Sequence, residues 1–382
     1  MRSIKLFIIA GEPSGDIHAA NLVGEIIAAA SPCTVSLSGA GGVALAKLGQ
    51  FQFASVSELA VIGFIDAVKK LIFFFRLSKR LEQHVAQEKP DVILLIDYTS
   101  FNLRFAQKVK KYNIPIIQFS APQVWIWRYS RVKILAKFFD KVLCLLPFEE
   151  PLLKKEGVNA VYIGHPAAAR LDEVATREDF CRKFSLPLDE PIIALAPGSR
   201  HREINYLMPV IAAAAKTLKD EGFKANFILA RANCISEELI KSYIPKSYGL
   251  NITIVEGEAP NIFKHSDIIW ICSGTATLEA GILGTPMIIL YKAPAIDVII
   301  IKALTKLRMI GLPNIILGRE AAPEVKGREC TPENLVKKTR EMLRESAMHR
   351  EALAPLKDMF TNRSAMKNAA KEVLEVIQQP ID

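Results

Sequence analysis

The feature that most constrains the fold is a repeated alternation of short apolar runs with amphipathic stretches. In the first half of the chain, apolar runs with strand-forming composition occur at 5–10, 34–38, 92–96, 115–119, 142–146 and 160–163. Stretches with helical periodicity, such as 17–30 and 101–111, lie between them. Strands that alternate with helices form a parallel sheet covered on both faces, and near-continuous apolar strands such as VILLI fit that burial.

The pattern pauses at 164–172 and then starts again. Further strands are expected at 192–196, 225–230, 252–255, 267–271 and 286–290, and only helices are expected from Thr331 onward. A chain of 382 residues is long enough for two hydrophobic cores. We therefore predict an α/β protein of two Rossmann-like, doubly wound domains that face a cleft. The domains would span 1–168 and 169–350, and the helices of 351–382 would pack on the first domain or on a partner subunit.

Composition narrows the class of protein. Half of the residues are apolar, which excludes disorder for most of the chain. No apolar run is long enough to span a bilayer, and the short run 6–10 favours a first strand over a signal peptide. Six scattered cysteines without a C-x-x-C pair indicate reduced thiols in a cytoplasmic protein. The net charge of +9 suits phosphorylated substrates or an anionic membrane surface, whereas no nucleic-acid motif accompanies it.

Two candidate sites follow strands of the first half. The loop GEPSGD, 11–16, combines glycines with a helix start, which suits an anion, but it also fits a plain turn capped by Ser14 or Asp16. Asp97 ends the strand VILLI, where ligands bind in such sheets. Its carboxylate suits a general base or a ligand for a sugar hydroxyl, and the alternative role is a helix N-cap.

Two anion-binding candidates follow strands of the second half. In PGSR, Gly198 and Ser199 can present backbone donors and Arg200 can bind a phosphate through its guanidinium, unless the segment is only an exposed basic turn. Ser273, Gly274 and Thr275 open a helix whose N-terminus suits a diphosphate, with Glu279 one turn on; a capping Ser followed by an ordinary Glu is the alternative.

Metal ligands are not evident in the sequence. It has no Asp-x-Asp, and its histidines are dispersed. We therefore expect no metal cofactor, so that protein groups such as Arg200 must neutralise a leaving diphosphate.

Aromatic residues mark two further segments. VWIWR, 124–128, places Trp125, Trp127 and Arg128 where they suit a sugar face or a phosphate, or else form a packed strand edge. On a helical wheel of 64–81, one apolar stripe would pack on the sheet: Phe64, Ile65, Val68, Leu71, Ile72 and Phe75. The outer face would then touch an anionic membrane, or a second subunit, through Lys69, Lys70, Phe73, Phe74, Leu77 and Arg80.

Taken in order, these motifs resemble the lipid-A-disaccharide synthase family of GT-B glycosyltransferases. The similar segments cover nearly the whole chain: AGEPSGD at 10–16, SELAVIGFID at 57–66, KPDVILLID at 89–97, SFN at 100–102, VWIWR at 124–128, LPFE at 146–149, GHP at 164–166, PGSR with Glu203 at 197–203, SGTATLE at 273–279 and PNIILGRE at 313–320 with Pro323 and Glu324. Each motif alone is weak, but the ordered set is specific.

The resemblance implies an inverting transfer. UDP-2,3-diacylglucosamine would donate its sugar to 2,3-diacylglucosamine 1-phosphate (lipid X), giving the β-1,6 tetraacyl disaccharide 1-phosphate and UDP in lipid A biosynthesis. It also implies a peripheral place on the cytoplasmic face of the inner membrane of a Gram-negative bacterium, and it leaves homo-oligomers open.

The resemblance also suggests roles for individual residues. UDP would lie against Gly198, Ser199, Arg200 and Ser273–Thr275, with Glu279 on the ribose. Asn314 matches an active-site Asn of the family, and the acceptor would contact Ser14, Gly15, Trp127 and Arg128.

One position departs from the family pattern. Ser100 stands where the family typically has a second Asp, and Ser is a poor proton acceptor. The base is then Asp97, Glu12 or Asp16, or the missing carboxylate was never the base, or activity is impaired. A UDP-sugar 2-epimerase, which should not bind anionic vesicles, and a non-catalytic UDP-sugar or lipid-binding protein, which should release no UDP, remain alternatives.

Overall fold

The computed structural model describes residues 3–59, 64–126, 128–169, 176–294, 309–361 and 364–378, with the backbone alone for 64–71 and 169. The chain divides into two compact units. Unit 1 comprises residues 1–166 and 362–382, and unit 2 comprises residues 167–361. The sequence placed these divisions at 168 and 350 instead.

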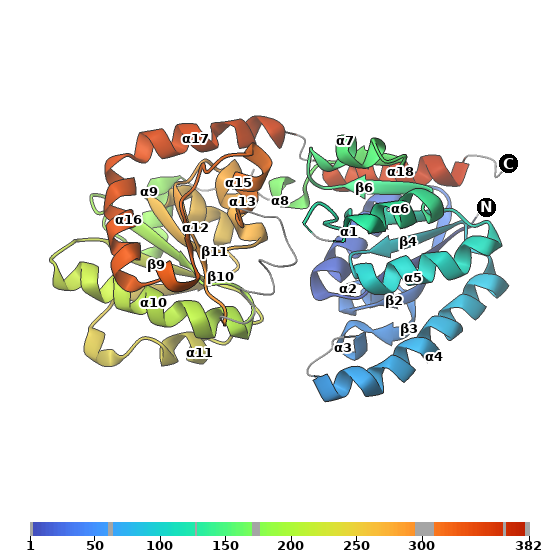
Figure 1. The fold of residues 1–382 in the computed structure, drawn as a ribbon, viewed down its shortest axis with the longest axis horizontal. Coiled ribbons are helices and arrows are strands. Elements are labelled where there is room, and N and C mark those ends of the chain that lie inside the picture. The colour runs from blue at the N-terminus through green and yellow to red at the C-terminus, as the bar shows by residue number, and fades with distance from the viewer. Residues whose placement is uncertain are drawn as a thin grey trace. The chain divides into compact units, whose positions relative to one another are not determined.

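Unit 1 is built on a parallel seven-stranded sheet of order β3-β2-β1-β4-β5-β6-β7 (Figure 1). Its strands are β1 (Ser3–Ala10), β2 (Thr34–Gly41), β3 (Phe51–Ser55), β4 (Val92–Ile96), β5 (Ile116–Phe119), β6 (Lys141–Cys144) and β7 (Ala160–Tyr162). Leu6 pairs with Leu37 on one side and Val92 on the other, so β1 lies at the centre of the sheet. All of the strands expected here are present, and β3 is an additional one.

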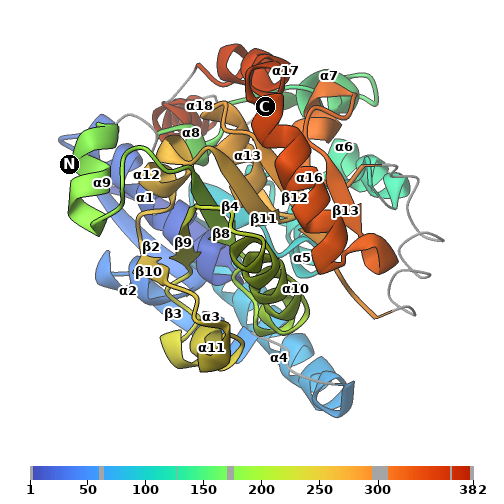
Figure 2. The ribbon, with the colours of Figure 1, turned by 90° about the vertical axis from the view of Figure 1, so that its left-hand side faces the viewer.

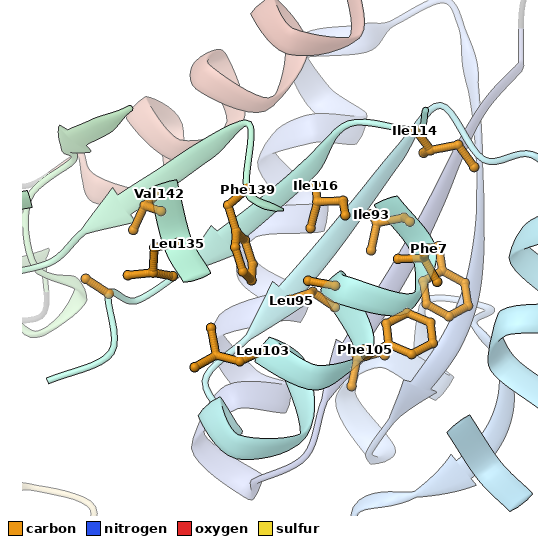
Figure 3. Packing of buried hydrophobic residues seen from close by; sticks show 14 of the residues in the cluster. Phe7, Ile93, Leu95, Leu103, Phe105, Ile114, Ile116, Leu135, Phe139 and Val142 are labelled. Atoms are coloured by element: carbon orange, nitrogen blue, oxygen red, sulfur yellow. The ribbon is translucent and has the colours of Figure 1, made fainter. Parts of the chain in front are cut away.

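Helices cover both faces of this sheet. They are α1 (Pro13–Ala30), α2 (Val43–Lys47), α3 (Val56–Leu59), α4 (Phe64–Glu88), α5 (Thr99–Val109), η1 (Lys110–Tyr112), η2 (Tyr129–Arg131), α6 (Val132–Phe138), α7 (Glu149–Lys154) and α18 (Ala365–Gln378). Alternate residues of β1 serve the two cores: Phe7 and Ile9 face α4, α5 and α6, and Leu6 and Ile8 face α1 and α18. Figure 3 shows the first core, where Phe7 stacks on Phe105 at 5.7 Å between ring centroids.

The last helix, α18, belongs to unit 1 although unit 2 precedes it in the chain. It packs on α1, and its apolar side chains enter the core beneath β1 and β4. Lys141 donates to Glu372 at 2.5 Å, and Nδ2 of Asn368 donates to the carbonyl of Ile163 at 2.9 Å. Of the terminal helices, α18 therefore returns to the first sheet, whereas α17 (Ser346–Met359) stays in unit 2.

Unit 2 repeats the design with a parallel six-stranded sheet of order β10-β9-β8-β11-β12-β13. Its strands are β8 (Ile192–Ala196), β9 (Asn226–Arg231), β10 (Ile252–Glu256), β11 (Ile268–Cys272), β12 (Met287–Tyr291) and β13 (Glu324–Lys326). Its other elements are α9 (Arg177–Phe184), α10 (His201–Asp220), α11 (Glu237–Ser242), η3 (Lys246–Tyr248), α12 (Ala259–His265), α13 (Thr275–Ile282), α15 (Leu312–Leu317), η4 (Gly327–Glu329) and α16 (Pro332–Arg344); α8 (Pro166–Ala169) lies at the unit boundary. Figure 2 shows α10 and α16 packed side by side on this sheet.

Both sheets have a point where the strand order reverses, between β1 and β4 in unit 1 and between β8 and β11 in unit 2. Ligands of doubly wound sheets bind at such points, beyond the carboxyl ends of the strands. The loops that leave these four strands carry GEPSGD, Asp97, PGSR and SGT. The fold therefore brings the predicted motifs together in two pairs, one pair in each unit.

Candidate active site

In unit 1 the loop after β1 lies directly against the residues that follow β4. A Cβ atom at Gly11 would lie 2.3 Å from the ring of Tyr98, and one at Gly15 would lie 3.3 Å from Oδ2 of Asp97. A side chain at position 11 would clash with the aromatic ring, so this close approach requires glycine. The structure thus joins the GEPSGD loop and Asp97 in one site.

Asp97 has the properties of a poised proton acceptor. Burial raises the pKa of its carboxyl group, and a hydrogen bond from the Ser120 side chain only partly opposes the shift. Its backbone is in the left-handed region, with φ of 48°, and Nδ2 of Asn102 donates to its carbonyl at 3.0 Å. A carboxylate with a raised pKa, held in a fixed position, suits general base catalysis near neutral pH.

Asp16 has a structural task in unit 1 that lies outside its own loop. Its Oδ1 accepts hydrogen bonds from the backbone N–H of Gly42 at 2.7 Å and Leu45 at 3.2 Å, and Oδ2 accepts from Ala44 at 2.8 Å. The side chain is buried, and it supplies the cap that the N-terminus of α2 lacks locally. Asp16 therefore holds α2 against α1, and its catalytic role stays a prediction.

Glu12 and Ser14 are exposed at the start of α1. Burial, with the charge of Glu12 nearby, raises the pKa of Tyr98 to about 12, and the Tyr98 hydroxyl donates to the carbonyl of Leu59 at 3.2 Å. Glu12 therefore lies near the same cluster as Asp97. It stays a candidate for the base, and Ser14 stays a candidate for acceptor binding.

Ser100 lies on the first turn of α5, three residues after Asp97. Its Oγ accepts a hydrogen bond from Nη2 of Arg131 at 3.1 Å. Arg128 precedes Arg131 and adopts a left-handed backbone with φ of 52°. The structure thus places Ser100, at the start of α5, beside the segment that holds the predicted acceptor residue Arg128, while Trp127 lies outside the described residues.

Glu149 is a buried acid whose importance the sequence did not reveal. Its Oε1 accepts from Nε1 of Trp125 at 3.2 Å, and Oε2 accepts from the backbone N–H of Leu146 at 3.1 Å. Burial raises the pKa of Glu149 to about 7 despite these hydrogen bonds. The LPFE motif was the only signal for it. Glu149 ties the Trp125 loop, which follows β5, to the loop that follows β6.

Unit 2 contains a cavity of about 550 Å³ at its switch point. Its walls come from the loops after β8, β9, β10 and β11 and from the start of α13. They include all the residues that the sequence suggested for UDP, namely Gly198, Ser199, Arg200, Ser273, Gly274, Thr275 and Glu279. A volume of several hundred Å³ suits a ligand of nucleotide size.

Glu203 holds the loop between β8 and α10 in place. Its Oε2 accepts from the backbone N–H of Ser199 at 2.9 Å and of Arg200 at 3.1 Å, and its Oε1 accepts from Nη1 of Arg200 at 2.8 Å. Gly198 has φ of +113°, and a Cβ there would lie 2.3 Å from Oε2 of Glu203. The backbone donor of Ser199 is thus occupied, contrary to the expectation that it faces a phosphate. The Arg200 side chain is 79% exposed.

The N-terminus of α13 offers backbone N–H donors to the cavity. Gly274 occupies the N-cap position and offers no side-chain cap, so the first N–H groups of the helix need another acceptor. Thr275 and Ala276 line the cavity there, and Glu279 lies one turn further on, 9% exposed. The Ser273 hydroxyl points elsewhere, because it donates to the carbonyl of Ile310 at 2.8 Å. An anion in the cavity would accept hydrogen bonds from the first N–H groups of α13.

Asn314, whose catalytic role stays a prediction, does not line this cavity. It is fully buried, and its Oδ1 accepts from the backbone N–H of Ala321 at 2.8 Å and Ala322 at 2.9 Å. Its Nδ2 donates to the carbonyl of Ala322 at 2.7 Å and to Oε1 of Glu324 at 2.9 Å. Glu324 also accepts from the N–H of Ile310, the residue that anchors Ser273. Asn314 therefore positions the loops behind α13.

Three polar residues of the cavity were missed from the sequence: Arg231, Asn233 and Glu256. Arg231 ends β9, where it pairs with Glu256 and donates to the carbonyl of Ile235 at 2.5 Å. The only available signal was their place after a predicted strand. Arg231 adds a second guanidinium group to the cavity that holds Arg200.

The outward face of α4 differs from the predicted one. Leu77 is 3% exposed, and Phe73 and Phe74 pack against the core, so these three residues face the protein. Ile72 and Phe75 are instead 59% and 66% exposed. The helical wheel had assigned the two apolar faces the wrong way round for the described side chains. The side chains of Lys69 and Lys70 lie outside the described set.

The basic residues of α4 whose side chains are described lie on the outward face. Arg76, Lys79 and Arg80 are exposed, and the Arg80 guanidinium lies over the ring of Phe53 at 5.5 Å. Among the described residues, no helix is long and apolar enough to cross a membrane. In the same part of the chain, no group of three or more His, Cys, Asp or Glu could hold a metal ion.

Comparison with known proteins extends over nearly the full length. The family model described as lipid-A-disaccharide synthetase matches residues 6–377. Lipid-A-disaccharide synthase of Syntrophus aciditrophicus (strain SB) is 34% identical over 383 residues and is covered to 99%, as is this chain. The enzyme of the same name from Myxococcus xanthus (strain DK1622) is 34% identical over 376 residues, which cover 98% of this chain and 97% of that one.

Solved structures share the fold at much lower identity. A putative UDP-N-acetylglucosamine 2-epimerase from Listeria monocytogenes superposes with a TM-score of 0.63 at 13% identity, over 98% of this chain and 96% of that one. The glycotransferase of kitacinnamycin gives a TM-score of 0.62 at 14% identity, over 98% of both chains. These neighbours support the two-domain GT-B fold alone and do not favour the epimerase alternative. The chain belongs to the lipid-A-disaccharide synthetase family, and it is a glycosyltransferase of lipid A biosynthesis.

Proposed function

We propose that this enzyme joins UDP-2,3-diacylglucosamine to 2,3-diacylglucosamine 1-phosphate and releases UDP. Family membership supports a transfer between lipid-linked sugars. The observation that carries the assignment of sites is the pair of switch points. One holds an acid with a raised pKa in unit 1, and the other holds a cavity with an open helix N-terminus in unit 2.

The donor would occupy the cavity of unit 2. The N–H groups at the start of α13 would bind the diphosphate, because they lack a side-chain cap. Arg200 would add positive charge as UDP leaves, after partial release from Glu203. Glu279 would accept hydrogen bonds from the ribose hydroxyls. Because these groups can neutralise the leaving diphosphate, we propose that the transfer needs no metal ion.

The acceptor would bind over the GEPSGD loop of unit 1. Its 6-hydroxyl oxygen attacks the anomeric carbon of the donor from the side opposite to UDP, so a carbon–oxygen bond forms as the bond to the diphosphate breaks. The hydroxyl proton passes to the carboxylate of Asp97, and the electron pair of the broken bond leaves with UDP. Asp97 is our choice of base because burial raises its pKa and Asp16 is occupied in capping α2.

Both substrates carry acyl chains, so the acceptor site must reach a membrane surface. We propose that unit 1 lies on the cytoplasmic face of the inner membrane through the exposed side of α4. Ile72 and Phe75 share that side with Arg76 and Lys79, and apolar groups ringed by cations suit an anionic interface. Ile72→Ser with Phe75→Ser should reduce flotation with anionic vesicles. Val43→Ser, which alters an equally exposed apolar residue of α2, should not.

The decisive test is UDP release by the purified chain with both diacylated sugars, with each sugar alone, and with both sugars plus EDTA. UDP should appear only when both sugars are present, and EDTA should not abolish it. Mass spectrometry should find the tetraacyl disaccharide 1-phosphate. Binding of the donor without UDP release would contradict the proposal and leave a non-catalytic binding protein.

A further inference from the structure

The N-terminus of α5 follows Asp97 closely in the chain, and no side chain of its N-cap residue accepts a hydrogen bond from its first N–H groups. Tyr98 occupies the N-cap position in a left-handed conformation and provides no side-chain acceptor for the first N–H groups of the helix. α5 spans eleven residues, so its dipole favours negative charge at this end. Asp97 lies two residues before the helix, so the base is a near neighbour in the chain of the first N–H groups of α5.

Three guanidinium groups converge on this helix end from two segments. Arg131 in η2 donates to Oγ of Ser100 at 3.1 Å, and Arg128 lies three residues before it. Arg104 lies one turn after Ser100 and therefore shares its face of α5. Burial together with the charges of Arg128 and Arg104 lowers the pKa of Arg131. Burial is the larger cause, and the charges of Arg128 and Arg104 act in the same direction.

The positive charge of these arginines is accessible to solvent. Arg104 and Arg128 are exposed, and Arg104 forms no ion pair with a carboxylate of the described residues. Arginine binds the oxygens of a phosphate through two parallel N–H groups, and a phosphate monoester carries close to two negative charges at neutral pH. Helix N–H groups and arginines together are the donors that such a ligand requires.

We propose that Arg104, Arg128 and Arg131, with the N-terminus of α5, bind the 1-phosphate of the acceptor sugar. This rests on the proposed function and extends it, because it fixes the orientation of the acceptor. With the phosphate at α5, the 6-hydroxymethyl group, which is attached to the other ring carbon next to the ring oxygen, would be directed toward Asp97. The neutral hydroxyl of Ser100 orients Arg131 and leaves its positive charge available to the phosphate. A carboxylate at this position would instead neutralise that charge.

A comparison of two acceptors tests the site. For Arg104→Ala, we expect KM for 2,3-diacylglucosamine 1-phosphate to rise about tenfold, with kcat and KM for the UDP-sugar nearly unchanged. With 2,3-diacylglucosamine, which lacks the phosphate, Arg104→Ala and the wild type should have equal kcat/KM. Lys155→Ala, which removes an exposed cation of the same unit, should change neither acceptor. Equal losses with both acceptors, or an unchanged KM, would overturn the proposal.

Two further variants separate charge from fold. Arg104→Lys keeps the charge and should recover part of the KM, whereas Ser100→Asp should raise KM for the phosphorylated acceptor because it neutralises Arg131. A rise in kcat for Ser100→Asp without a rise in KM would instead show that a base was missing, and it would contradict the phosphate site. If Arg104→Ala weakens binding to anionic vesicles and leaves acceptor KM intact, the site binds lipid headgroups and the proposal fails.

Failure of the phosphate site can be distinguished from failure of the proposed reaction. If the wild type releases no UDP with either acceptor, the proposed reaction is wrong. Titration calorimetry with inorganic phosphate then still tests the site. The wild type should bind phosphate more tightly than Arg104→Ala, and identical isotherms would exclude an anion site at α5.

Discussion

Replacing Asp97 by Asn should reduce kcat by about 10²–10⁴-fold without destabilising the chain. A loss of kcat of this size is typical when a general base is removed. Stability should hold because burial disfavours the charged carboxylate and raises its pKa. Above the unfolded-state pKa, ionisation of Asp97 therefore costs folding free energy, and a neutral Asn avoids that cost. Asn can also keep the hydrogen bond from Ser120. The melting temperature should be equal to that of the wild type or higher.

The assay combines UDP release at saturating substrates with thermal unfolding. In the wild type, kcat/KM should rise with pH as Asp97 loses its proton, with an acidic limb above the ordinary pKa of Asp. The residual rate of Asp97→Asn should lack that limb. A variant with full activity, or one whose lost activity accompanies a lower melting temperature, would refute the assignment. Glu12→Gln is the matched test of the neighbouring acid, and it should retain most of the activity.

Three other replacements follow from the hydrogen bonds. Asp16→Ala removes three acceptor contacts of a buried carboxylate, so unit 1 should lose roughly 3–5 kcal/mol and melt roughly 10 °C lower. Asn314→Ala should destabilise unit 2 by about 2–4 kcal/mol, seen in chemical denaturation, while the folded fraction still binds UDP. Arg200→Ala should lower kcat about 10- to 100-fold with an unchanged melting curve, and an unaltered kcat would remove Arg200 from the leaving-group site.

The strands were predictable because a parallel strand covered on both faces reads as an uninterrupted apolar run. All eleven expected strands are present. The two that were missed lie at sheet edges: β3 reads FQFAS, which is partly polar, and β13 has only three residues. Edge strands need fewer apolar residues, so the signal that identified the inner strands is weak there.

The functional motifs were placed correctly at the ends of strands, but individual roles depended on distant partners. Asp16 caps a helix whose N-cap residue, Gly42, lies 26 residues later, and nothing in GEPSGD shows which N–H groups its carboxylate meets. In α4, both Phe73 with Leu77 and Ile72 with Phe75 form apolar stripes. Periodicity detects both stripes, but only the packing on the sheet decides which one is buried.

Glu149 offers the clearest link between pH and the part of unit 1 that we propose binds the acceptor. A rise of its pKa from 4.5 to about 7 corresponds to roughly 3 kcal/mol. The folded state holds the proton more tightly than the unfolded state, so this contribution to stability is complete below pH 4.5 and is lost as the pH rises through about 7. Over that interval, the ionised carboxylate destabilises the junction between the Trp125 loop and the loop after β6.

The variant Glu149→Gln isolates this effect, because Gln does not ionise and the other carboxyl groups remain the same in both proteins. Gln can accept one hydrogen bond, from Trp125 or from Leu146, and the loss of the second is independent of pH. The difference in melting temperature between variant and wild type should therefore shift in favour of the variant by roughly 10 °C between pH 5 and pH 8. Fluorescence of Trp125 should follow the same transition in the wild type. A difference in melting temperature that stays constant over this range would mean that Glu149 titrates normally, and its burial would then have to be compensated by a contact other than those of Trp125 and Leu146.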